Sequence, residues 1–115
     1  MNCPLGHGTA GGRVIEAFED RLVPAMRSFQ PELIVISAGF DALVEDPMAS
    51  FELTPDDFTS LTRIVMNLAD ATASGRVVSI LEGGYHPPAL AAAVGQHIEA
   101  LASAAPDRRS EGSRV

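Results

Sequence analysis

Two apolar segments of the sequence each lead into a side chain that can do chemistry. Residues 33–38 run into Gly-Phe-Asp and reach Asp41, and residues 77–81 run into Glu-Gly-Gly-Tyr and reach Tyr85. Both segments are rich in β-branched residues and show no polar alternation, which predicts buried parallel strands. Ligands of open α/β sheets bind just beyond the carboxyl ends of the strands. The sequence therefore places one carboxylate and one phenol where such a fold binds its ligands.

Each of these two side chains has a chemical and a structural interpretation. Asp41 could ligate a metal ion, act as a general base or form a turn. Tyr85 is the only tyrosine and follows two glycines, which let a ligand approach the backbone closely. Its phenol could donate a hydrogen bond to a developing oxyanion, or it could be a surface aromatic on a loop. Taken singly, neither residue decides between these interpretations.

The other candidate metal ligands do not form a motif of their own. The sequence has three histidines and one cysteine, with no His-x-x-x-His or Cys-x-x-Cys pair. His97 lies on the apolar stripe of a predicted helix and is expected to be packed, whereas His86 adjoins Tyr85 without a companion. Cys3 is the single cysteine, so no internal disulfide can form, which fits a reducing compartment.

Residues 1–12 form a predicted glycine-rich loop. The segment 6–11 matches G-x-G-x-x-G, which in a dinucleotide-binding fold follows a strand and opens a helix. Only five residues precede the segment, and no acidic residue ends a second strand at the expected distance, so a loop is favoured over a nucleotide site. Residues 13–29 then show helical spacing, in which Pro24 should kink or split the helix.

Capping signals predict two further helices. Thr54 and Asp57 form the pattern of a capping box, and Gly75 is well placed to end the helix that follows. Pro87 opens the last helix, after the second strand. The resulting order, helix–strand–helix–strand–helix, is one βαβ crossover with a helix on each side, and the predicted fold class is α/β.

Two parallel strands alone would make a poor sheet. Both outer edges would lie open, although both strands are almost entirely apolar. We therefore expect this chain to be part of a larger, mostly parallel sheet with helices on both faces. Self-association through the open sheet edges is the alternative.

Composition sets limits on the class of protein. The chain of 115 residues allows one domain, and its net charge of −7 without any lysine argues against a nucleic-acid partner. No apolar stretch is long enough to cross a bilayer, and the N-terminus lacks the features of a signal peptide. We expect a soluble, cytoplasmic protein with no membrane partner. A polar tail over residues 104–115 is expected to be disordered.

Several segments, in order, resemble the histone deacetylase superfamily of zinc-dependent amidohydrolases, which includes acetylpolyamine amidohydrolases and acetoin-utilisation-type proteins. The matching segments are Asn-Cys-Pro-Leu at 2–5, the run FQPELIVISAGFDA at 29–42, Asp-Pro-Met at 46–48 and Leu-Glu-Gly-Gly-Tyr at 81–85. The resemblance covers residues 2–103. It implies an arginase/deacetylase-like fold, of which residues 1–103 would be the C-terminal part of the catalytic domain.

The resemblance also implies roles for six matched positions. Asp41 aligns with a zinc-ligand aspartate, and Tyr85 aligns with the catalytic tyrosine that hydrogen-bonds the substrate carbonyl and its oxyanion. The implied substrate-pocket residues are Gly83, Gly84, Met48 and Phe40. The implied cofactor is Zn²⁺, and the implied substrate is an acetylated amine, either acetyl-lysine or an acetylpolyamine.

Other parts of the family's site have no counterpart in this sequence. The Asp-x-His pair that supplies two further zinc ligands, and the tandem histidines that handle protons, would lie upstream of the matched segments. A catalytic zinc site uses three protein ligands, so Asp41 alone is not expected to hold the metal. We therefore expect the isolated chain to be an inactive deacetylase part. The alternative is a non-catalytic fragment or interaction module that associates through its sheet edge.

Overall fold

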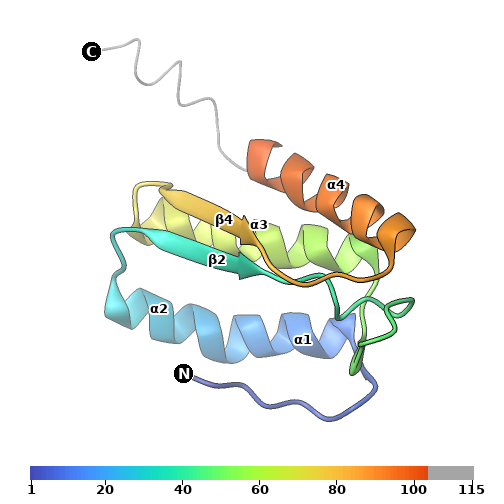
Figure 1. Cartoon of the computed structure of the whole chain (residues 1–115). Helices are drawn as coiled ribbons and strands as arrows, with labels where there is room; N and C mark the ends of the chain where they lie inside the picture. Colours follow the sequence, from blue (N-terminus) through green and yellow to red (C-terminus); the bar gives the residue numbers. More distant parts are fainter. Residues whose placement is uncertain (104–115) are drawn as a thin grey trace.

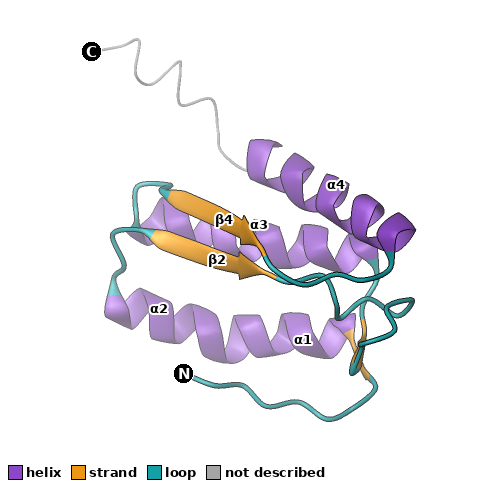
Figure 2. Cartoon of the chain, in the orientation of Figure 1, coloured by secondary structure: helices purple, strands orange, loops and turns teal. Residues whose placement is uncertain are grey.

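A computed structural model describes residues 1–103, and the polar tail predicted for 104–115 lies outside the described residues. The described chain combines helices with short parallel strands (Figures 1 and 2). In chain order they are β1 (Thr9–Ala10), α1 (Gly11–Ala17), the π-helix η1 (Phe18–Leu22), α2 (Val23–Phe29), β2 (Ile34–Ala38), β3 (Phe51–Glu52), α3 (Pro55–Thr72), β4 (Val77–Leu81) and α4 (Pro87–Ser103).

Strands β2 and β4 pair in parallel, in register from Ile34 with Val77 to Ala38 with Leu81. Helix α3 makes the crossover between them and lies behind the two strands in Figure 1. A second, two-residue parallel ladder joins β1 to β3 within the stretch that was predicted to be only a loop. The predicted βαβ unit is therefore confirmed.

The first helical region is continuous from α1 through η1 to α2, and it changes character just before Pro24. Proline has no N–H, and its ring clashes with the carbonyl four residues earlier, so the regular ladder cannot continue through it. The chain accommodates this with one wider, π-helical stretch of five residues, Phe18–Leu22. The predicted interruption is confirmed, and the helix begins at Gly11, two residues before the predicted start.

Helix α3 is fixed at both ends by the residues that predicted it. The Asp57 carboxylate accepts hydrogen bonds from the backbone N–H of Thr54 at 2.8 Å and from its hydroxyl at 3.1 Å. At the other end, Gly75 has a φ of 72° and its N–H donates to the carbonyl of Ala69 at 2.9 Å. Only a left-handed residue can turn the chain back in this way, so a glycine is favoured here.

The helices pack on one face of the β2–β4 pair. Ile34 is buried against Leu68 and Ala69 of α3, and Ala38 is buried against Ala89 and Ala93 of α4. Helix α2 joins the same layer by contacting this side of β2.

The opposite face of the pair is uncovered within residues 1–103. Val35, Val78 and Ile80 point to that side and are between 47% and 57% exposed. The prediction that both strands are fully buried is therefore wrong for the described chain. Successive strand residues face opposite sides, and no described element lies over the second side. Of the helices that we expected on both faces, the described residues supply those of one face only.

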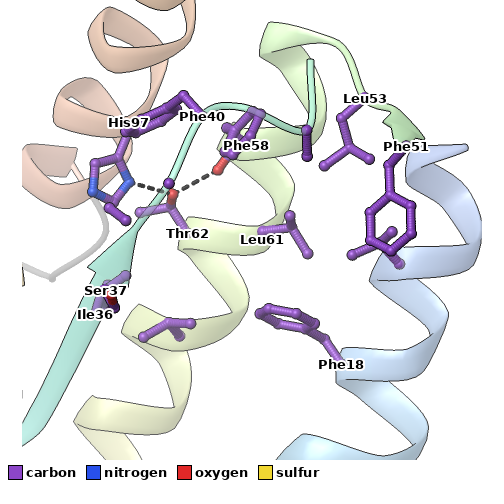
Figure 3. A pocket seen from close by; sticks show the side chains of 15 residues that line it. Phe18, Ile36, Ser37, Phe40, Phe51, Leu53, Phe58, Leu61, Thr62 and His97 are labelled. Carbon is purple, nitrogen blue, oxygen red and sulfur yellow. Dashed lines mark hydrogen bonds between the residues drawn. The ribbon is translucent and has the colours of Figure 1, made fainter. Parts of the chain in front are cut away.

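His97 joins three elements from within the core, as a packed histidine. Its Nδ1 lies 2.7 Å from the Thr62 hydroxyl of α3, and its Nε2 lies 2.8 Å from the Ser79 hydroxyl of β4. Thr62 donates its only proton to the carbonyl of Phe58 (Figure 3), so its oxygen accepts from Nδ1–H. Nε2 is then an acceptor for Ser79, and the ring is neutral.

This arrangement predicts a pH-dependent stability. Burial lowers the pKa of His97 below its ordinary value of 6.5. Below that pH the unfolded chain binds a proton that the folded chain does not, so the unfolded state is favoured. The free energy of unfolding should therefore hold its full value above about pH 6.5 and decline as the pH falls below that value. Urea denaturation at a series of pH values measures this slope.

In that experiment His97→Gln should flatten the slope, because glutamine cannot take up the proton. His7→Gln, at an exposed loop position, serves as the control and should keep the wild-type slope. Equal slopes for the wild type and His97→Gln would contradict the prediction.

Candidate active site

Asp41 and Tyr85 converge on Gly83 at the carboxyl end of the β2–β4 pair. A Cβ placed on Gly83 would lie 2.6 Å from Asp41 Oδ2 and 3.4 Å from the Tyr85 hydroxyl. Both side chains therefore lie against this glycine, which leaves room for them because it has no side chain. The structure thus brings together the carboxylate and the phenol that the sequence placed after separate strands.

The two loops are held together by hydrogen bonds that extend the strand ladder. The N–H of Glu82 donates to the carbonyl of Ala38 at 2.9 Å, and the N–H of Phe40 donates to the carbonyl of Gly83 at 2.8 Å. Of these four residues only Ala38 still belongs to a strand. The continued pairing fixes the separation of the segments that carry Asp41 and Tyr85.

Gly84 packs tightly against the core beneath this loop. Its φ is 146°, in the region that favours glycine, and a Cβ on it would lie 2.6 Å from Leu90 Cδ1 and 3.4 Å from Phe40 Cβ. Gly83 thus allows close approach at the site, whereas Gly84 allows the loop to turn onto helix α4.

Phe40 has a different place from the one implied for it. Its side chain is 1% exposed and packs against the Phe58 ring, with ring centroids 4.8 Å apart. It points into the core on the helix side, away from the surface that Tyr85 shares with solvent. Phe40 therefore packs in the core beneath the candidate site, whereas the next residue, Asp41, points toward the surface.

Met48 lies near Asp41 at the surface. Both residues line a hollow of about 240 Å³, together with Ala42, Ser50 and Phe51. The Met48 side chain is exposed there. The structure thus places Met48 beside the candidate metal ligand.

Asp46 is a site residue that the sequence did not reveal. Its carboxylate is buried, and it accepts hydrogen bonds from the N–H of Met48 at 2.8 Å and of Tyr85 at 2.7 Å. The bond to Met48 joins residues two positions apart and is part of a local turn. The bond to Tyr85 joins residues 39 positions apart, so no local pattern could have revealed it.

The N-terminal glycines make no phosphate site. A Cβ on Gly11 would clash with the Asp57 carboxylate, so this carboxylate lies against the start of α1. A nucleotide phosphate would need that position and would be repelled by the negative charge. The absence of a side chain at Gly11 lets α1 approach α3 closely. Thr9–Ala10 form β1 and α1 begins at Gly11, so the prediction of a loop over residues 1–12 is wrong for residues 9–12.

The described residues do not by themselves make a zinc site. Within residues 1–103, no group of three or more His, Cys, Asp or Glu side chains is placed to hold a metal ion. Asp41 offers a single carboxylate, whereas catalytic zinc is held by three protein ligands. No helix among the described residues is long and apolar enough to span a membrane.

An apolar cavity of about 220 Å³ lies apart from these residues, between β2 and helices α1 and α3 (Figure 3). Its walls are mostly aromatic and aliphatic side chains, with His97 and Thr62 at one end. Neither Asp41 nor Tyr85 lines it. Gly39, Phe40 and Ala42, which flank Asp41 in the sequence, do line the cavity, whereas the candidate chemistry of Asp41 and Tyr85 lies at the surface beyond the strand ends.

The contacts of Gly84 predict a large stability effect. Gly84→Ala should lower the free energy of unfolding by about 2–4 kcal/mol, because it adds backbone strain to overpacking against Leu90. Gly95→Ala is the matched control: a Cβ there meets nothing within 4 Å, and it should stabilise α4 by up to about 1 kcal/mol. Chemical denaturation compares the two, and equal stabilities would contradict the packing described for Gly84.

Comparison with known proteins agrees with this arrangement. The family model of the histone deacetylase domain matches residues 1–101. The chain is 37% identical over 101 residues to histone deacetylase 14, chloroplastic, of Arabidopsis thaliana, covering 88% of this chain and 24% of that protein. It is 38% identical over 102 residues to the human polyamine deacetylase HDAC10, covering 88% of this chain and 15% of that protein.

The fold is also that of solved relatives. The structure of the histone deacetylase Clr3 superposes with a TM-score of 0.78 at 31% identity, covering 87% of this chain and 16% of that one. The chain thus spans about a quarter or less of the length of these relatives. Since the family model covers nearly all of the described residues, and the strand-end motifs lie where the fold brings them together, this chain belongs to the histone deacetylase family.

Proposed function

We propose that this chain supplies one part of the active site of a deacetylase that hydrolyses N-acetyl amides. The observation that carries this proposal is the convergence of Asp41 and Tyr85 on Gly83 at the carboxyl end of a parallel strand pair. In a family of deacetylases, a carboxylate and a phenol at this place are suited to act on one carbonyl group.

In the proposed reaction the Tyr85 phenol donates a hydrogen bond to the substrate carbonyl oxygen. That oxygen gains negative charge as the tetrahedral intermediate forms, and a fixed donor there stabilises the transition state more than the ground state. The Tyr85 side chain is 57% exposed, so the phenol is within reach of a substrate that arrives from solvent. The Tyr85 hydroxyl and the Asp41 carboxylate both lie against Gly83, so both face the place proposed for the acetamide.

Asp41 would supply one oxygen ligand to the zinc ion that the family resemblance implies. Further ligands would have to come from outside the described residues. The proposed substrates are an acetyl-lysine side chain and an acetylated polyamine, and the second is supported by the printed name of the human relative, a polyamine deacetylase. Both are N-acetyl derivatives of a primary amine, so one carbonyl-binding arrangement serves either.

An activity assay tests this proposal. The purified 115-residue chain should not release acetate from an acetyl-lysine peptide or from an acetylated polyamine, with or without added zinc. A longer polypeptide, read from the coding DNA on both sides of this sequence, should do so. In that longer protein Tyr85→Phe should lower kcat by about 10²–10³-fold, the usual effect of removing one oxyanion donor.

Glu45→Gln is the control for that assay, because Glu45 is an exposed carboxylate close to Asp41 in sequence. It should leave kcat unchanged. Acetate release by the 115-residue chain alone, abolished by a chelator, would contradict the incomplete metal site. Full activity of Tyr85→Phe in the longer protein would contradict the role of the phenol.

A second candidate function, association without catalysis, is favoured by a specific observation. Val35, Val78 and Ile80 form an apolar, exposed strand face, and the described residues pair only one edge of each strand. Unpaired strand edges and exposed apolar strand faces promote pairing with another chain. We propose as the alternative that the chain associates with a partner or with itself along this sheet.

Sedimentation at several concentrations tests the alternative. If it holds, the chain should form a concentration-dependent oligomer without added metal, and Ile80→Lys should shift it toward monomer because a charge on the strand face opposes pairing. Ile98→Lys, at a similarly exposed position on α4, should leave the oligomer intact. A monomer at every concentration would rule out self-association.

A further inference from the structure

The Tyr85 side chain has little packing of its own to hold it. More than half of its surface is open to solvent, and the two residues before it are glycines. Glycine backbones have more freedom than those of other residues, so the direction of the phenol depends on what fixes the backbone at residue 85.

Asp46 provides that restraint. Its Oδ2 accepts the Tyr85 N–H at 2.7 Å, and its Oδ1 accepts the Met48 N–H at 2.8 Å. Asp46 is 6% exposed, and hydrogen bonds from N–H groups to a carboxylate are among the strong ones. One buried side chain therefore ties together the loop after Asp41 and the loop that carries the phenol.

The backbone of Asp46 is itself held by two hydrogen bonds. Its N–H donates to the carbonyl of Leu43 at 3.0 Å, and its carbonyl accepts from the N–H of Ala49 at 3.1 Å. Leu43 is one of the most deeply buried side chains of the core and is bridged to Leu53. The backbone of Asp46 is thus fixed to the core, and its carboxylate in turn fixes the backbone N–H of Tyr85.

We propose that Asp46 is a positioning residue for Tyr85. By accepting the Tyr85 N–H it fixes the backbone from which the phenol reaches Gly83 and Asp41. By accepting the Met48 N–H it sets one wall of the hollow beside Asp41. Only a carboxylate can do both, because its two oxygens each accept, whereas an amide has one acceptor oxygen. The catalytic consequence rests on the proposed function, while the restraint itself does not.

The chain offers a direct measure of this restraint. It has one tyrosine and no tryptophan, so its tyrosine fluorescence reports on residue 85 alone. Amide hydrogen exchange of the 115-residue chain, followed by NMR, reports on the N–H groups of Tyr85 and Met48. In Asp46→Asn at least one of these two amides should exchange about tenfold faster, beyond any change shared by all amides, as expected for a lost hydrogen bond. The fluorescence anisotropy of Tyr85 should fall.

Glu45→Gln is again the matched control, and it should change neither amide. Unchanged exchange at both amides in folded Asp46→Asn would overturn the proposal, and so would a change that is equal at every amide. If Asp46→Asn does not fold, the wild-type chain decides. A protected Tyr85 amide supports the restraint, and exchange at the rate of an open loop overturns it.

A double-mutant comparison separates this proposal from the function on which its consequence rests. In the longer, active protein Asp46→Asn should lower kcat by about tenfold with KM unchanged, and it should have no further effect in the Tyr85→Phe background. Equal losses in both backgrounds would overturn positioning. If the longer protein has no deacetylase activity, the proposed function fails, and the exchange result still decides whether Asp46 holds Tyr85.

Discussion

Parallel pairing of β2 with β4 continues beyond both strands, and the candidate site depends on this continuation. The N–H of Phe40 still donates to the carbonyl of Gly83 where neither residue belongs to a strand. Without that bond the two loops would leave the sheet in independent directions. With it, Asp41 and Tyr85 both meet the bare backbone of Gly83. The pairing of the strands therefore determines the relative position of Asp41 and Tyr85, and neither loop could do so alone.

The helix layer supports this edge from one side only. The Phe40 side chain packs in the core against Phe58 and His97, and the backbone of Gly84 packs against Leu90 of α4. These contacts hold the loops from below, while the outer face of the strands has no cover within residues 1–103. The chain corresponds to 24% of the Arabidopsis relative and to 16% of the Clr3 chain, so those proteins contain much that this chain does not.

Much of the fold could be predicted from the sequence, because the signals were local. The capping box of Thr54 and Asp57, the left-handed Gly75 and the interruption at Pro24 each follow from the chemistry of a few adjacent residues. The meeting of Asp41 and Tyr85 followed from a general rule of parallel sheets. The inward turn of Phe40 and the bond from Tyr85 to Asp46 did not, because each depends on which distant surface packs against the residue.

The contacts that build the site also join remote parts of the chain. The bond between Tyr85 and Asp46 spans 39 residues, and the one between Ser37 and Glu82 spans 45. Closing such long loops costs entropy before any of these bonds can form. Helix α3 is the segment that brings β4 alongside β2. A substitution that destabilises α3 far from Asp41 should therefore also loosen the contacts that hold Tyr85.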